Sequence, residues 1–158
     1  MSAAHLFPCF LLAAMCASCA ASPSRSWPQI LSDESAMAGE AEFSISYPGE
    51  QGGAVQTFTV SSLGGGRYKA WAHSSRRAVR EKELTSQQYE ELAASLRQLD
   101  FQALEQEEPG ACEKFTLKIQ VRGREGRFQG CRRSGANASL ISRLAHRTEF
   151  LLLSAPGR

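Results

Sequence analysis

The spacing of apolar residues in this chain changes from every second position to every third or fourth, and this change limits the folds it can adopt. In 42–47, Glu-Phe-Ser-Ile-Ser-Tyr, polar and apolar residues alternate, as they do in a strand with one buried face. Two more β-rich runs follow at 55–61 and 67–72, and the turn at Leu63–Gly66 between them predicts a hairpin. The first half of the domain is therefore predicted to consist of strands.

Helical spacing begins at Thr85. Thr85 and Gln88 form a capping box, in which each side chain can bond the backbone amide of the other residue. Leu84 and Tyr89 occupy the positions of a hydrophobic staple around this cap. Apolar residues then recur on one helical face, at Tyr89, Leu92, Ala93, Leu96 and Leu99. The sequence predicts a helix over about 85–99.

A second hairpin and a second helix are predicted in the last third of the chain. Phe115–Val121 and Arg127–Gln129 flank a turn at Arg122–Gly126. Asn137 can cap a last helix over about 138–153. The order of strands, helix, hairpin and helix predicts an α+β fold: an antiparallel sheet of about five strands built from hairpins, with both helices packed on one face.

Size and composition fit one globular domain, which we expect at 42–153 with a short tail at 154–158. The chain has 158 residues, of which 42% are hydrophobic and 22% charged, and these values argue against general disorder. The formal net charge of +2 is too small to indicate nucleic-acid binding. After the N-terminal segment, no apolar run reaches the roughly 18 residues that a membrane-spanning helix needs.

The N-terminus has the features of an export signal. An apolar run from Leu6 to Ala21 ends in small residues, although no Lys or Arg precedes it. Residues 1–18 are interpreted as the signal. Residues 19–41, which are rich in Ser, Pro, Ala and acidic side chains, are interpreted as a flexible tether.

The sequence Ala17-Ser18-Cys19 resembles the lipobox of bacterial lipoproteins, in which small residues precede a cysteine that is acylated and becomes the new N-terminus. The resemblance implies a lipid on Cys19, with Cys16 as the alternative. Because Ala20 rather than Asp follows Cys19, it also implies anchoring on the periplasmic face of the outer membrane. Two other interpretations are ordinary cleavage after Ala20 or Ala21, which would give a soluble periplasmic or secreted protein, and a cytosolic protein with an unusual N-terminus.

Two of the five cysteines lie in the predicted domain. Cys112 and Cys131 flank the second hairpin, with one near each open end. In an oxidising compartment such a pair is expected to form a structural disulfide rather than a redox-active site or a metal site. A disulfide that closes so short a loop should stabilise the fold by about 3 kcal/mol.

The sequence contains no recognisable catalytic set, and we expect a protein that is not an enzyme. The domain histidines, His73 and His146, have no partner at metal-ligand spacing, so no metal and no cofactor are expected. Asp100 is the only aspartate outside the predicted tether, which leaves little for a hydrolase triad.

Two basic stretches give the main indication of a binding function. They lie at 67–82 and 118–133. If these stretches are on adjacent strands, their cations would form one face able to bind anionic lipid, polysaccharide or an acidic protein. The candidate residues for this face are Arg67, Lys69, Lys118, Arg122, Arg124 and Arg127.

The order of elements over 42–153 resembles that of emfourin-type inhibitors of thermolysin-like metalloproteases, which share short strands around a capped helix. This resemblance implies a periplasmic or secreted protease inhibitor, in which an exposed loop such as Pro48–Ala54 would enter the protease cleft. The signal, the cysteine pair and the basic stretches together favour the other hypothesis, an exported, lipid-anchored envelope protein that binds a protein or an anionic envelope component.

Overall fold

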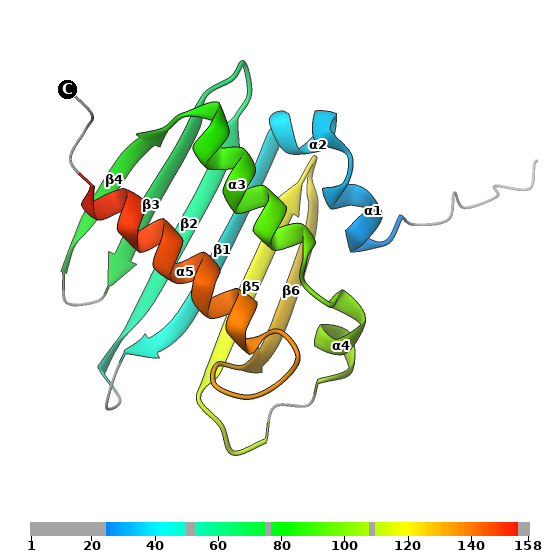
Figure 1. The fold of residues 1–158 in the computed structure, drawn as a ribbon, viewed down its shortest axis with the longest axis vertical. Helices are drawn as coiled ribbons and strands as arrows, with labels where there is room; N and C mark the ends of the chain where they lie inside the picture. The colour runs from blue at the N-terminus through cyan, green and yellow to red at the C-terminus, as the bar shows by residue number, and fades with distance from the viewer. Residues whose placement is uncertain (1–24, 50–52, 75–76, 108–109, 155–158) are drawn as a thin grey trace, which may run out of the picture.

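Six antiparallel strands form one sheet, and helices cover one of its faces (Figure 1). The computed structural model describes residues 25–49, 53–74, 77–107 and 110–154. In chain order the elements are α1 (Trp27–Leu31), α2 (Glu34–Ala38), β1 (Glu40–Gly49), β2 (Gly53–Leu63), β3 (Tyr68–Ser74), β4 (Arg77–Leu84), α3 (Ser86–Arg97), α4 (Phe101–Gln106), β5 (Lys114–Val121), β6 (Arg124–Cys131) and α5 (Ala138–Leu153). The α+β class is confirmed.

The strand order is β4-β3-β2-β1-β5-β6, so β1 lies inside the sheet. Strands β1 to β4 follow one another as a meander, and the β5–β6 hairpin adds to the free side of β1. Phe43 of β1 is opposite Val60 of β2 on one side and Ile119 of β5 on the other. The pairing of β1 with β5 therefore joins the two halves of the chain.

The alternation in the inner strands turns their apolar residues toward the helices. Residues at the centre of this face are at most 2% exposed: Phe43, Ile45, Val60, Leu117 and Ile119. Helices α3 and α5 lie side by side across them, as Figure 1 shows. The opposite face of the sheet carries polar residues, among them a hydrogen-bonded pair of hydroxyls on Ser46 and Thr57. One apolar and one polar face is the usual division in an antiparallel sheet.

The sheet has six strands instead of about five, because β4 was not among the predicted strands. Its sequence, Arg-Ala-Val-Arg-Glu-Lys-Glu-Leu, is mostly charged and lacks the expected alternation. Charged residues are typical of an edge strand, where they oppose pairing with other chains. Lys82 also has a structural role, since its Nζ donates hydrogen bonds to the carbonyls of Leu151 and Ser154 at the end of α5.

Both predicted helices are present, and their caps differ. Thr85 and Gln88 form the predicted capping box at the start of α3. Asn137 precedes α5, but its side chain makes no capping bond there, which corrects the prediction. The Asn137 amide is 1% exposed and bonds both the N–H and the carbonyl of Asp100, so it links the start of α5 to the start of α4.

The predicted tether is wrong for residues 25–41, which fold as α1, α2 and the start of β1. The Ser, Pro and acidic residues that suggested a linker lie at helix starts: the Gln29 side chain accepts the N–H of Ser26, and the Asp33 carboxylate accepts the N–H of Ala36. The apolar residues between them, Trp27, Leu31, Ala36 and Met37, are buried. Residues 19–24, the rest of the predicted tether, lie outside the described residues.

Helix α3 holds this N-terminal segment in place. The Tyr89 hydroxyl donates to the carbonyl of Met37 at 2.7 Å, and the Arg97 Nε donates to the carbonyl of Leu31 at 2.8 Å. Burial raises the pKa of Tyr89 well above its ordinary value, so the hydroxyl keeps the proton that it donates. The Tyr89 ring also stacks on Tyr68 of β3 with 4.3 Å between centroids.

Trp27 attaches α1 to the hairpin. Its ring meets Phe128 edge to face at 6.1 Å, and the Arg124 guanidinium lies 5.1 Å from the ring centroid. The indole also occupies the space that a Cβ on Gly126 would need, so only glycine allows this close approach.

The cysteine pair is joined as expected. Cys112 and Cys131 form a disulfide with their Cα atoms 5.7 Å apart, which connects the segment before β5 to the end of β6. The Glu107 carboxylate accepts the N–H of Cys131 at 3.0 Å. This corner is therefore held by a covalent bond and by a hydrogen bond from the backbone to a side-chain carboxyl group.

Replacing Trp27 by alanine tests whether α1 belongs to the folded domain. We expect Trp27→Ala to lower the free energy of unfolding by about 3 kcal/mol, because a large side chain is removed from a packed site. Trp71→Ala is the matched control: Trp71 is half-buried on the polar face, and its loss should cost only about 1 kcal/mol. Chemical denaturation measures both, and equal small effects would contradict the packing of α1.

Candidate functional site

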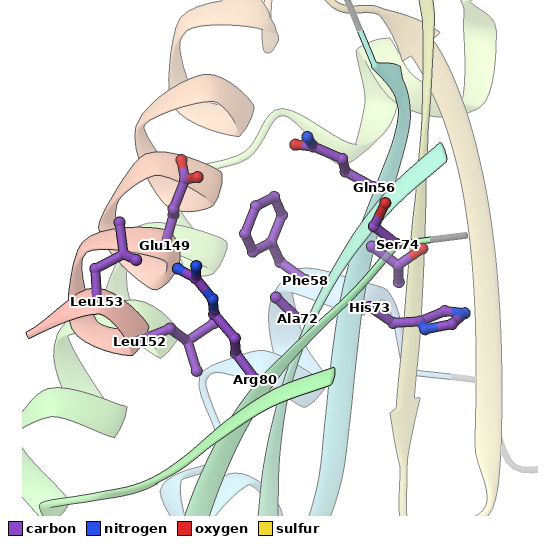
Figure 2. Close-up of a pocket in the computed structure, with 10 residues that line it drawn as sticks. Gln56, Phe58, Ala72, His73, Ser74, Arg80, Glu149, Leu152 and Leu153 are labelled. Carbon is purple, nitrogen blue, oxygen red and sulfur yellow. The ribbon is translucent and has the colours of Figure 1, made fainter. Parts of the chain in front are cut away.

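A hollow lies beside the C-terminal turns of α5, at the ends of β2, β3 and β4 (Figure 2). The hollow is shallow and open to solvent, with a cavity volume of about 50 Å³. The side chains that form it from the helix side are Gln56, Phe58, Ala72, Ser74, Arg80, Glu149, Leu152 and Leu153. His73 also borders it, but its ring points away, as Figure 2 shows.

The strand register produces this hollow. Phe58, Ala72 and Arg80 are cross-strand neighbours on β2, β3 and β4. Ala72 is too small to fill the space between its larger neighbours. The β3–β4 register also shifts between Ala72 and Ser74, which is typical of a bulge that bends a strand.

The chemistry of the hollow combines an apolar floor with charges at the rim. Phe58, which is 5% exposed, forms the buried floor of the hollow, and Leu152 is partly buried beside it. Arg80 extends along the hollow from β4, and it makes no ion pair with any described residue. Glu149 stands on the α5 side.

Exposed apolar residues extend this site over the outside of α5. Phe150 is 70% exposed and Leu153 is 57% exposed. Leu153 also lines the hollow, so the apolar surface continues from the cavity onto the helix. Large apolar residues adjoining a cavity indicate a binding surface more strongly than single exposed ones do.

The predicted basic face is not formed, because its two groups lie in different halves of the sheet, on strands that are not neighbours. Arg67 precedes β3 and Lys69 is on β3, whereas Lys118 is on β5 and Arg127 on β6. Strands β2 and β1 separate the two groups. A local sequence pattern does not reveal strand order, and the hairpin that follows in the chain pairs with β1 rather than with β4.

Each group has a different environment. Lys69 is paired with Glu81 at 2.7 Å. Lys118 and Arg127 are direct cross-strand partners on the polar face, where both are exposed. They are the two candidate residues that the fold places side by side away from the helices.

Arg122 and Arg124 lie at the β5–β6 turn, beside the N-terminal helices. An Arg122 Nη donates to the hydroxyl of Ser35 at 2.9 Å, and the other lies 4.0 Å from the Asp33 carboxylate. Hydrogen bonds from Ser35 and from the backbone of Ala36, together with the nearby arginines, hold the pKa of Asp33 below its usual value. Asp33 therefore stays ionised at neutral pH and offsets part of this positive charge.

The remaining predictions concern catalysis, metals and the inhibitory loop. The described residues contain no group of three His, Cys, Asp or Glu that could hold a metal ion. Part of the Pro48–Ala54 loop and both candidate lipidation sites, Cys19 and Cys16, lie outside the described residues.

The sequence analysis did not find the hollow. Arg80 belongs to a basic stretch and Leu152 to a helix face, but no local pattern in the sequence indicates that these two residues meet.

No family model matches this chain, and no curated protein matches it either. Among the helices of the described segments, none is long and apolar enough to cross a membrane.

An amphiphilic dye tests the chemistry of the hollow. Anilinonaphthalenesulfonate has fused aromatic rings and one anionic group, so we expect it to bind and fluoresce. Arg80→Gln should weaken binding about fivefold, the effect of losing one exposed charge pair. Arg143→Gln, on the outside of α5, is the matched control and should change nothing. Equal affinities for both variants would contradict a role for Arg80.

Proposed function

We propose that this chain is an exported, lipid-anchored envelope protein without enzymatic activity, which binds another protein through the hollow beside α5. The observation that carries the binding role is the apolar floor of Phe58 and Leu152 beside Arg80, whose guanidinium pairs with no described carboxylate. A peptide segment with one apolar and one acidic side chain has the chemistry to occupy it.

Export is supported by the disulfide. Disulfides persist in oxidising compartments such as the bacterial periplasm and are rare in the cytosol. Cys112 and Cys131 have the geometry of a bonded pair, and the N-terminal lipobox resemblance supplies a route out of the cytosol. The lipid on Cys19, or on Cys16 as the alternative, is part of the same proposal.

A binding role is also consistent with the exposed apolar surface. Phe150 and Leu153 do not pack in the core. Their exposure to water is unfavourable and does not stabilise the isolated domain. A partner that covers them would bury the centre of an interface, where apolar side chains contribute most. Lys118 and Arg127 remain a second candidate contact for an anionic envelope component.

One experiment on the full chain from membrane fractions tests this proposal. Intact mass should show a chain that begins at Cys19 with acyl groups attached. Its mass should rise by two hydrogen atoms when Cys112 and Cys131 are reduced. A photo-crosslinking residue at Leu153 should trap one envelope protein, and Arg80→Glu should abolish that product.

The controls separate anchoring from binding. The same crosslinker at Leu63, which is exposed at the other end of the sheet, should trap nothing specific. Cys19→Ala should release the protein from membranes if Cys19 carries the lipid. A chain that retains Met1, with both thiols free, would refute export. Crosslinking unaffected by Arg80→Glu would refute the binding site.

A further inference from the structure

The structure fixes the place where the chain enters the folded domain. Trp27 is buried against Phe128 of β6, and an Arg124 Nη donates to the carbonyl of Arg25. Figure 1 shows α1 beside β6, and α2 at the turn that joins β5 and β6. Whatever precedes Arg25 therefore approaches the domain at this end of the sheet.

An anchor at Cys19 would hold this end close to the bilayer. Six residue steps separate Cys19 from Arg25, and at full extension they span about 20 Å. A strand of eleven residues such as β2 is about 36 Å long. With the tether predicted from the sequence, the domain could present any side to the membrane. With α1 and α2 folded onto the domain, the chain is too short for that.

Two arginines at this end, Arg25 and Arg122, are more exposed than the carboxylate that they share, Asp33. The side chains of Arg25 and Arg122 are 68% and 57% exposed, whereas Asp33 between them is 26% exposed. Both guanidinium groups lie within 4.0 Å of the Asp33 carboxylate and extend past it into solvent. The planar guanidinium forms paired hydrogen bonds with phosphate oxygens, which makes phospholipid headgroups suitable ligands.

Carboxylates near these arginines weaken the attraction of the domain to anionic headgroups, so the contact with the membrane is expected to be weak. Glu34, Glu40 and Glu125 are exposed near the same turns. The domain alone should therefore bind anionic vesicles poorly. A covalent anchor raises the local concentration of headgroups, so a few weak arginine–phosphate contacts are enough to orient an anchored domain.

We propose that Arg25 and Arg122, at the arginine end of the sheet, dock on phospholipid phosphates of the membrane that holds the lipid on Cys19. This inference rests on the lipid anchor of the proposed function. Docking here leaves the hollow beside α5 free. The β5–β6 turn lies at the end of the sheet that holds Leu63 and Leu84, whereas Gln56 of the hollow lies toward the other end. The partner-binding site then faces away from the bilayer.

Hydrogen exchange on the full acylated chain tests the orientation. The protein is reconstituted into phosphatidylcholine vesicles with and without phosphatidylglycerol. We expect amides at 121–126 to exchange about fivefold more slowly on the anionic vesicles, the factor that one arginine near such a surface supplies. Amides at 72–74 and 79–81, beside the hollow, should be unchanged.

Two charge reversals give a matched comparison. Arg122→Glu should remove the protection at 121–126. Arg133→Glu should not, since Arg133 is an exposed arginine beside a carboxylate, Glu113, at the other end of the hairpin. Protection near the hollow, or none at 121–126 in an acylated, vesicle-bound protein, would overturn the orientation while leaving the anchor intact. Absence of acyl chains in the intact mass would instead overturn the anchor and this inference with it.

Discussion

The pairing of β1 with β5 is the interaction on which the rest of the structure depends. It is the contact that joins the meander of β1 to β4 with the hairpin of β5 and β6. Phe43 and Ile45 pack beside Ile119 and Leu117, and this row forms the floor on which α3 and α5 lie. Without it, each half of the sheet would leave its apolar face incomplete. The disulfide stabilises the hairpin locally but does not link it to β1.

The sequence predicted the elements whose signals are local. The alternation in 42–47 and the capping box at Thr85 depend on neighbouring residues, and both elements formed. Strand β4 was missed because it lies at the edge of the sheet, where charged residues replace the alternation of polar and apolar residues. Helices α1 and α2 were missed because residues that cap helices, such as Ser26 and Asp33, are also typical of linkers. Only tertiary packing distinguishes a short capped helix from a linker, or a charged edge strand from a loop.

The functional surfaces depend on strand order, which no local pattern reveals. The predicted basic face required two hairpins to be neighbours, and β1 and β2 lie between them. The hollow requires Phe58, Ala72 and Arg80 to be aligned across three strands beneath the end of α5. The folding of residues 25–41 also bears on function, since it shortens the chain between Cys19 and the domain. The short chain from the proposed anchor therefore sets which end of the sheet faces the membrane, and this orientation leaves the hollow facing away from it.

Native-state hydrogen exchange tests most directly whether β1 unites the two halves. If it does, amides of β1 and β5 at 43–46 and 116–119 should exchange only through global unfolding, with one shared opening free energy. That free energy should equal the value from chemical denaturation. If the amides of β5 open at a clearly lower free energy while those of β1 and β2 stay protected, the hairpin is a separate unit, and the central role of the β1–β5 pairing is contradicted.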